Sequence, residues 1–136
     1  IRMAPRVHDP DPHYDDVVAE VCSFLADRAG RARAAGIGAD MIVVDAGFDL
    51  GKTPSQSLEL LRASASLAEL GYPLLLSASN KQFLGALFDL AIEERRDVSL
   101  GAVAVGIALG CRIVRVHDVV GARQVCDALE AVLRAS

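Results

Sequence analysis

The chain has 136 residues, of which 52% are hydrophobic and 24% are charged, and its formal net charge is −4. This composition supplies enough apolar side chains for the core of one globular domain and excludes an intrinsically disordered chain. The basic residues are scattered, so no positively charged face for nucleic acid is expected. No apolar run reaches the roughly 18 residues of a membrane-spanning helix, so no membrane contact is expected either.

Cysteine and histidine spacing predicts no metal site. Cys22, Cys111 and Cys126 lie far apart with no Cys-x-x-Cys pair, which is not typical of a zinc site or a disulfide framework. We therefore expect buried thiols in a cytoplasmic protein. His8 and His13 fall in a loop rich in proline and aspartate and are expected to be solvated.

The first element expected in chain order is a helix over residues 14–35. Its apolar residues at helical spacing are Val17, Val21, Phe24 and Leu25. Glycines at positions 36 and 38 end this helix. The apolar run over residues 41–45 that follows is typical of a strand buried on both faces.

The same order of helix and strand recurs along the rest of the chain. Thr53 and Pro54 begin the next helix, and its expected apolar stripe consists of Leu58, Leu61, Ala65 and Ala68. A strand over residues 74–78 follows. Helical sequence over residues 80–95, continued or broken near residues 95–97, leads through an apolar helix to a strand over 112–117. The final helix has an apolar face made of Val125, Leu129, Val132 and Leu133.

These repeats predict a parallel α/β fold. Strands near residues 41, 74 and 112 are each followed by a polar loop and a helix, which is the βα repeat. Eight such units make a (β/α)₈ TIM-type barrel of about 250 residues. Residues 1–136 hold three units and a candidate strand at residues 1–3, so we predict one domain that is half of a barrel. A small doubly wound sheet of four strands is the alternative. Because the first residue is not methionine, we expect further residues upstream.

Polar side chains follow all three predicted strands, where parallel sheets bind ligands. Asp45 and Lys52 follow the first strand, Ser79, Asn80 and Lys81 follow the second, and Arg115 and His117 lie on the third. Arg115 and His117 are two positions apart and therefore point to the same face. Two such donors are expected to meet an anion, and the alternative is an internal ion pair with Asp118 or Asp45.

Several of these residues have a second interpretation. Lys81 is equally consistent with a solvated lysine at a helix start, and Asp45 with a cap of the following turn. Phe48 and Phe83 are expected to pack in the core rather than to stack on a ligand. Residues 51–53 resemble the end of a P-loop, but the spacing G-x-x-x-x-G-K-T is not met, which excludes a nucleotide triphosphatase on this motif.

Three stretches resemble, in order and at matching separations, the C-terminal half of the dihydropteroate synthases: VVDAGFDLGKTPSQSLELL, YPLLLSASNKQFLG and RIVRVHDV. The family has a (β/α)₈ fold. The resemblance implies condensation of 6-hydroxymethyl-7,8-dihydropterin pyrophosphate with para-aminobenzoate and release of pyrophosphate. It also implies Mg²⁺, with a ligand expected in the N-terminal half. A homodimer is expected through the outer helices, since the apolar helix SLGAVAVGIALG suits such a contact.

The resemblance also implies roles for individual residues. Asp45 matches the aspartate of D-P-G-F-G-F-G-K, which accepts hydrogen bonds from the pterin. Lys81 and Ser79 match the lysine and serine of S-R-K, where the lysine donates to the pterin. Arg115 and His117 match R-x-H, which holds the phosphate side and stabilises the charge that develops there.

Two further substrate-binding residues, Phe48 and Leu50, are expected from the same motif as Asp45. The catalytic residues implied are Lys81, Arg115 and His117.

Five positions depart from the family's motifs. Ala46 stands in place of proline, Leu50 in place of an aromatic residue, Ser77 in place of glycine, Asn80 in place of arginine and Gln82 in place of a serine. These changes affect the para-aminobenzoate pocket more than the pterin pocket. In them the chain resembles the divergent second copies of actinobacteria. A working synthase, a pterin-binding or repurposed paralogue without that activity, and a pterin-dependent methyltransferase domain therefore stay open.

Overall fold

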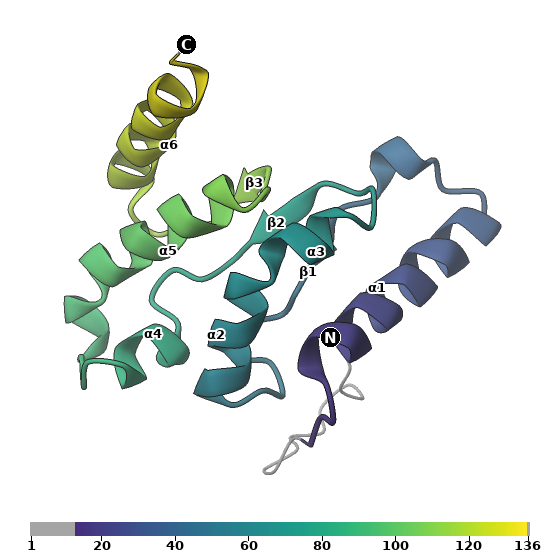
Figure 1. Ribbon diagram of the computed structural model, residues 1–136, viewed down its shortest axis with the longest axis horizontal. Coiled ribbons are helices and arrows are strands. Elements are labelled where there is room, and N and C mark those ends of the chain that lie inside the picture. Colours follow the sequence, from purple (N-terminus) through teal and green to yellow (C-terminus); the bar gives the residue numbers. More distant parts are fainter. Residues whose placement is uncertain (1–12, 136) are drawn as a thin grey trace.

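The computed structural model describes residues 13–135, in which three short strands form one parallel sheet (Figure 1). The strands are β1 (Val44–Asp45), β2 (Leu74–Leu76) and β3 (Ile113–Val114). They lie in the order β1-β2-β3, with Asp45 paired to Leu75 and Leu75 paired to Ile113. The predicted parallel arrangement is confirmed, whereas the candidate strand at residues 1–3 lies outside the described residues.

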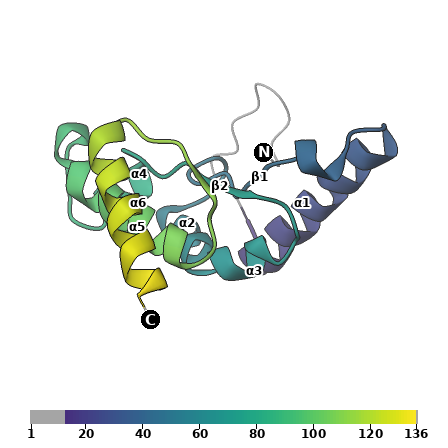
Figure 2. The same cartoon turned by 90° about the horizontal axis from the view of Figure 1, so that it is seen from above.

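Residues 13–135 also contain six helices, which lie before, between and after these strands. They are α1 (Val17–Ala34), α2 (Pro54–Arg62), α3 (Ser64–Ala68), α4 (Gln82–Ala86), α5 (Arg96–Ala108) and α6 (Val119–Arg134), with short 3-10 turns at Ala39–Met41 and Ile92–Glu94. Figure 2 shows the strands along one side of the molecule and the helices along the other. A doubly wound sheet would carry helices on both faces and reverse its strand order. The single helical layer and the sequential strand order therefore favour part of a barrel with its inner face uncovered.

Side chains fix the starts of the longer helices. Asp16 caps α1, since its Oδ1 accepts hydrogen bonds from the backbone N–H groups of Val18 and Ala19 at 3.0 and 2.9 Å. Thr53 and Gln56 form a reciprocal capping box at the start of α2, with Pro54 in its first position. These caps begin both helices where the sequence predicts them, to within three residues.

The predicted apolar stripe of the second helix is right for Leu61, which is buried, and for Leu58, which packs against the core, but wrong for Ala65, which is exposed. The helix breaks at Ala63, and the buried residues of α2 and α3 are Ser57, Leu60, Leu61, Ser64 and Leu67. Two of them are serines whose hydroxyl groups have local partners. The Ser64 hydroxyl donates to the Leu61 carbonyl at 2.8 Å, and the Ser57 hydroxyl accepts from the Asp49 N–H at 3.1 Å. Polar residues with satisfied hydrogen bonds thus occupy core positions that an apolar pattern misses.

The strands are shorter than predicted and are covered on one face only. Met41 ends a 3-10 turn instead of beginning a strand. Val44, Leu74 and Leu76 are buried, but Val43 is 49% exposed and Ile113 is 37% exposed. The prediction that the strand over 41–45 is buried on both faces is wrong for the described chain, because its helices cover a single face.

The helix predicted over 80–95 is much shorter than expected, since only α4 and the 3-10 turn at Ile92–Glu94 are helical there, although a break before α5 at Arg95 was one of the two options. The helix α4 ends at Ala86, and α5 begins at Arg96 after a loop in which Asp89 has a positive φ of 52°. At Gly106 the helix α5 packs closely on β2, since a Cβ there would lie 2.6 Å from Cδ2 of Leu76. Across residues 13–135, no helix combines the length and the apolar character that crossing a membrane requires.

Candidate active site at the strand ends

A cavity of about 320 Å³ lies at the carboxyl ends of the three strands. Its lining residues are Asp45, Gly47, Phe48, Leu50, Leu75, Ser77, Lys81 and Arg115. The structure therefore brings together five of the seven site residues predicted from the sequence, from three different strand ends. Ser79 and His117 line a second cavity of about 140 Å³ beside α5.

Asp45 is half-buried at the end of β1 and makes a turn with one carboxylate oxygen. Its Oδ1 accepts a hydrogen bond from the Gly47 N–H at 2.7 Å. This is the turn cap that the sequence analysis gave as the alternative role. Within residues 13–135 no hydrogen bond is made to Oδ2, so this oxygen can accept from a ligand in the cavity while Oδ1 holds the turn.

Lys52 braces the loop after β1. Its Nζ donates to the carbonyl oxygens of Gly47 and Leu50 at 3.0 and 3.2 Å and lies 5.9 Å from the ring centroid of Tyr14. The Tyr14 hydroxyl in turn donates to the Gly51 carbonyl at 3.0 Å. Lys52 is not among the residues that line the cavity, so it supports the loop from outside.

The sequence analysis missed Asp49, which joins the first two strand-end loops. Asp49 has a φ of 60°, and its carboxylate accepts from the backbone N–H groups of Gln82 at 2.6 Å and Phe83 at 3.2 Å. A second link runs from Lys81 Nζ to the Phe48 carbonyl oxygen at 3.1 Å. The sequence did carry a signal for Asp49. This residue occupies the second glycine position of the family motif D-P-G-F-G-F-G-K, and a glycine there indicates a backbone with positive φ.

Phe48 and Phe83 stack on each other in the core. Their ring centroids lie 5.5 Å apart at an interplanar angle of 25°, and both side chains are buried. The predicted packing role is therefore confirmed for both residues. Phe48 and Leu50 both line the cavity, and Leu50 is partly exposed.

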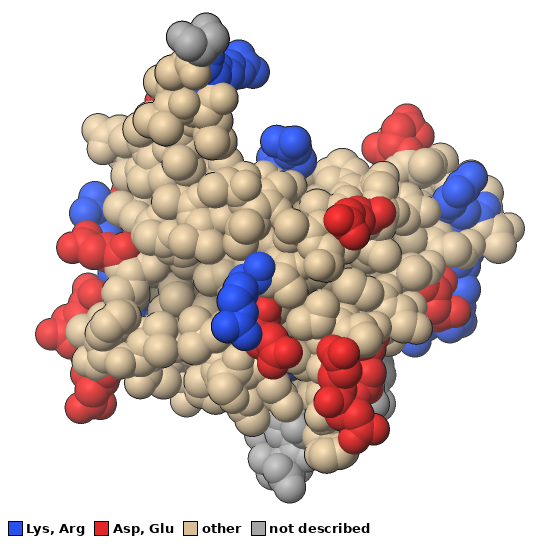
Figure 3. Space-filling view, in the orientation of Figure 1, with Lys and Arg blue, Asp and Glu red and all other residues tan. Residues whose placement is uncertain are grey.

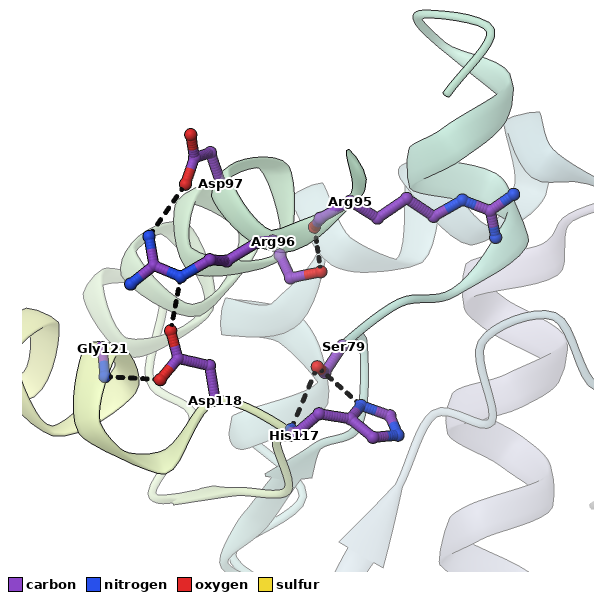
Figure 4. Close-up of polar contacts among 8 residues, drawn as sticks. Ser79, Arg95, Arg96, Asp97, His117, Asp118 and Gly121 are labelled. Carbon is purple, nitrogen blue, oxygen red and sulfur yellow. Dashed lines mark hydrogen bonds and ion pairs between the residues drawn. The ribbon is translucent and has the colours of Figure 1, made fainter. Parts of the chain in front are cut away.

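Two exposed side chains that can donate hydrogen bonds, Arg115 and His117, follow β3, and each contacts one serine hydroxyl. Figure 4 shows the pair of His117 and Ser79. Arg115 Nε donates to the Ser77 hydroxyl at 3.1 Å. The Ser79 hydroxyl lies 2.9 Å from Nδ1 of His117 and accepts from the His117 backbone N–H at 3.2 Å. If this hydroxyl donates its own hydrogen to Nδ1, then a neutral His117 ring carries its proton on Nε2. Nε2 is then a donor for an anion.

The alternative ion pair between Arg115 and Asp118 is wrong. Asp118 lies 2.8 Å from Arg96 Nε and accepts from the Gly121 N–H at 2.8 Å (Figure 4). The Gly121 hydrogen bond and the Arg96 guanidinium lower the pKa of the Asp118 carboxyl. No ion pair of Arg115, with Asp45 or with any other carboxylate, exists within the described residues 13–135.

The remaining cysteine and histidine residues do not assemble into a site. Cys111 is buried and its pKa is raised by that burial, while Cys22 and Cys126 are half-buried free thiols. His13 is exposed and lies 3.1 Å from Asp15, and His8 falls outside the described residues. In the part of the chain from residue 13 to residue 135, no three His, Cys, Asp or Glu residues are placed to hold a metal ion.

Comparison with known proteins identifies related sequences and folds. The family described as pterin binding enzyme matches residues 1–117. The dihydropteroate synthase of Neisseria meningitidis is 40% identical over 129 residues, which is 93% of this chain and 44% of the relative. A protein named inactive dihydropteroate synthase 2 of Mycobacterium leprae is 38% identical over 118 residues, covering 87% of this chain and 39% of that protein.

A solved structure gives the same result for the fold. The chain superimposes on the dihydropteroate synthase of Stenotrophomonas maltophilia with a TM-score of 0.96 and 38% identity, covering all of this chain and 52% of that one. The α/β barrel-type fold, with this chain as one half, is thereby confirmed. The chain spans less than half the length of the two curated relatives described above.

Proposed function

Because the chain belongs to the pterin binding enzyme family, we propose that it carries half of the active site of a dihydropteroate synthase. In that reaction the amine nitrogen of para-aminobenzoate forms a bond to the methylene carbon of 6-hydroxymethyl-7,8-dihydropterin pyrophosphate. The carbon–oxygen bond to pyrophosphate breaks, its electron pair leaves with the pyrophosphate, and the amine loses a proton. The observation that carries the proposal is the cavity of about 320 Å³ that Asp45, Lys81 and Arg115 share.

Asp45 and Lys81 are suited to bind the pterin. The free Oδ2 of Asp45 can accept from the amino and ring N–H groups of a pterin, and a carboxylate makes such bonds short and strong. Lys81 Nζ uses one of its three hydrogens on the Phe48 carbonyl at 3.1 Å. Its remaining hydrogens can donate to the acceptor atoms of the same ring. Leu50, which lines this cavity, would contact para-aminobenzoate as an apolar side chain.

Arg115 and His117 are suited to bind the pyrophosphate. Both side chains are exposed at one end of one strand, and each is bonded to a single serine hydroxyl through its side chain. The Arg115 fork matches phosphate oxygens, and His117 can add a donor from Nε2. Donors that are already in place stabilise the negative charge that grows on the leaving pyrophosphate.

Magnesium, if used, would need ligands from outside the described residues, which form no metal cluster. We therefore assign no step of the reaction to it. Its proposed role stays the one implied by the resemblance, which is to assist the leaving pyrophosphate. A cytoplasmic location is also proposed, from the three free cysteines, which suit a reducing compartment.

A homodimer through the outer helices is also proposed. Val105 on α5 and Val119 and Val120 on α6 are exposed large apolar residues. Figure 3 shows the helix-covered face, on which the surface over the middle of α5 carries few charged side chains. Burial of such a surface between two copies would remove apolar area from water. Light scattering at micromolar concentration tests this, and a monomer would contradict it.

A pterin-binding paralogue without synthase activity is the second candidate. The Mycobacterium leprae relative named as inactive is nearly as similar to this chain as the synthase of Neisseria meningitidis, at 38% against 40% identity. The departures at Leu50, Asn80 and Gln82 affect the second-substrate side of the pocket in particular. Such a protein would keep the Asp45 and Lys81 contacts and lose turnover.

Two experiments test these proposals. In a complete barrel carrying these residues, pyrophosphate release from the pterin substrate and para-aminobenzoate is expected for a synthase, and pterin binding without release identifies the paralogue. The 136-residue chain alone is expected to show no turnover, since it holds half of the pocket. In that chain, titration with pyrophosphate should move the ring resonances of His117, and the Arg115→Gln variant should reduce the response. No movement at millimolar pyrophosphate would exclude the anion site.

A further inference from the structure

Arg95 lies just before α5 and reaches back to the loop after β2. Its Nε and Nη2 both donate to the Leu90 carbonyl oxygen at 3.1 Å, and its Nη1 donates to the Asn80 carbonyl oxygen at 3.2 Å. Within residues 13–135 it pairs with no carboxylate. Its neighbour Arg96 extends in the opposite direction, toward Asp118 (Figure 4). All three nitrogens of the Arg95 guanidinium therefore hold backbone carbonyl groups.

The backbone of Asn80 is held on its other side by the same turn of α5. Asn80 has a left-handed φ of 58°, a conformation that costs free energy unless its surroundings maintain it. The Asn80 N–H donates to the buried Ser99 hydroxyl at 3.0 Å, and that hydroxyl donates to the Arg95 carbonyl at 2.5 Å. Arg95 and Ser99 thus satisfy both backbone groups of Asn80.

Gly85 makes room for the Arg95 side chain. A Cβ at Gly85 would lie 2.5 Å from Cζ and 2.8 Å from Nη2 of Arg95, which is closer than side chains approach. The guanidinium therefore occupies the space that any other residue at position 85 would fill. A glycine inside α4 and an arginine ten positions later form one structural unit.

We propose that Arg95 is a positioning residue for the proposed active site. Asn80 lies between Ser79, which is bonded to the His117 ring, and Lys81, which lines the larger cavity. By holding the Asn80 carbonyl, Arg95 fixes the backbone of the loop and with it the directions in which the Ser79 and Lys81 side chains point. The claim about the loop stands on its contacts alone, whereas its effect on pterin binding rests on the proposed function.

Amide hydrogen exchange on the 136-residue chain tests the claim about the loop. Arg95→Ala is expected to raise the exchange rates of the Asn80 and Lys81 amides at least about tenfold relative to the Val103 amide inside α5, because the loop opens locally. Gly85→Ala should have the same effect, since it displaces the guanidinium. Combining the two should add nothing, because both remove one contact.

Two controls separate positioning from general stability. Gly101→Ala, at a site where a Cβ would meet nothing within 4 Å, should leave the exchange of the loop unchanged. Millimolar guanidinium should slow exchange of the Asn80 amide again in Arg95→Ala and have no effect in Gly85→Ala, where the space is filled.

Three results would overturn the proposal. They are loop exchange within about twofold of the unaltered chain, a rise shared equally by Val103, or full additivity of the two substitutions. Pterin affinity of a complete barrel is a separate readout. If pterin fails to bind even the unaltered protein, the proposed function fails, while the exchange result still decides the role of Arg95.

Discussion

The loops after β1 and β2 differ sharply from the end of β3 in how their polar groups are used. In the two loops, Asp49, Lys52 and Lys81 all bond to backbone groups of these loops or of the first turn of α4. At the end of β3, the Arg115 and His117 side chains each meet one serine hydroxyl and no carboxylate of the described residues. The first region satisfies its own hydrogen bonds, whereas the second keeps donors available.

This difference separates supporting residues from binding residues. A charged side chain at a strand end holds a loop when backbone groups take up its hydrogen bonds, and it can bind a ligand when they do not. Asp45 and Lys81 lie between these cases. Oδ1 of Asp45 holds the turn at Gly47 while Oδ2 makes no hydrogen bond within residues 13–135, and Lys81 Nζ gives one of its three hydrogens to the Phe48 carbonyl while it lines the cavity. Substitutions that remove one role and keep the other can therefore test the distinction.

Asp45→Asn is expected to give the largest effect. In a complete barrel it should weaken pterin binding by about 1.5–3 kcal/mol, the scale of a hydrogen bond to a charged group. Asparagine keeps an oxygen for the Gly47 N–H, so the free energy of unfolding should change little. Calorimetric titration with the pterin substrate and urea denaturation measure the two quantities. If the pterin affinity were unchanged, the only role of Asp45 would be to cap the turn at Gly47.

Asp49→Ala should act on stability instead. It removes hydrogen bonds to two backbone N–H groups and places alanine at a φ of 60°, so the free energy of unfolding of this chain should fall by about 2 kcal/mol. Asp49→Asn keeps one acceptor and tolerates this φ, and should cost less than about 1 kcal/mol. Arg115 is exposed, so Arg115→Gln should change the free energy of unfolding by less than about 0.5 kcal/mol. If Asp49→Ala and Arg115→Gln lowered the free energy of unfolding equally, Asp49 would not differ from Arg115 as a supporting residue.

Much of the fold and part of the site could be predicted from the sequence. Apolar runs bounded by glycine and proline predict the parallel strands, and their carboxyl ends indicate Asp45, Lys81 and Arg115 as cavity residues, because strand direction alone determines where those ends meet. Hydrophobic spacing missed two core positions of α2 and α3, because Ser57 and Ser64 are buried serines with hydrogen-bond partners.

Asp49 and Arg95 could not be recognised in this way. Their partners are backbone groups of Gln82, Phe83, Leu90 and Asn80. Every residue has a carbonyl and all but proline an N–H, so the sequence carries no pattern that marks which of them a side chain will reach. Loops that approach each other only after folding bring these groups within hydrogen-bonding distance.

Asn80→Arg should have a smaller effect on a complete barrel. It adds a positive charge near an anionic substrate, but arginine suits the φ of 58° less well than asparagine, at a cost of roughly 1 kcal/mol. A synthase should therefore gain at most about tenfold in kcat/KM for para-aminobenzoate. Asn80→Gly is the matched control, since it relaxes the backbone without adding charge. If Asn80→Gly raised kcat/KM as much as Asn80→Arg, the added charge would be ruled out as the cause. If neither variant raised kcat/KM while pterin binding stayed intact, the result would favour the paralogue without synthase activity.

The smallest expected effect is the pH dependence of stability at Asp118. This residue caps α6 through the Gly121 N–H, and that hydrogen bond, followed by Arg96, lowers the pKa of its carboxyl in the folded state. A carboxyl whose pKa falls on folding stabilises the folded state above its unfolded pKa of about 3.9, and this contribution is lost as pH falls through the folded pKa. Arg96 is 60% exposed, so solvent and salt weaken the pair.

Asp118→Asn should therefore lower the free energy of unfolding at neutral pH, and the difference from the unaltered chain should close in acid. Asparagine still accepts from Gly121, so the substitution isolates the charge. Urea denaturation from neutral pH to about pH 2 measures the gap, and added salt should narrow it at neutral pH. Asp97→Asn is the matched control, because Asp97 also pairs with Arg96 at 3.1 Å but is 89% exposed, and it should give a smaller gap. A gap that stays constant or widens in acid would contradict the assignment, because a neutral carboxyl gives up its ionic contact with Arg96.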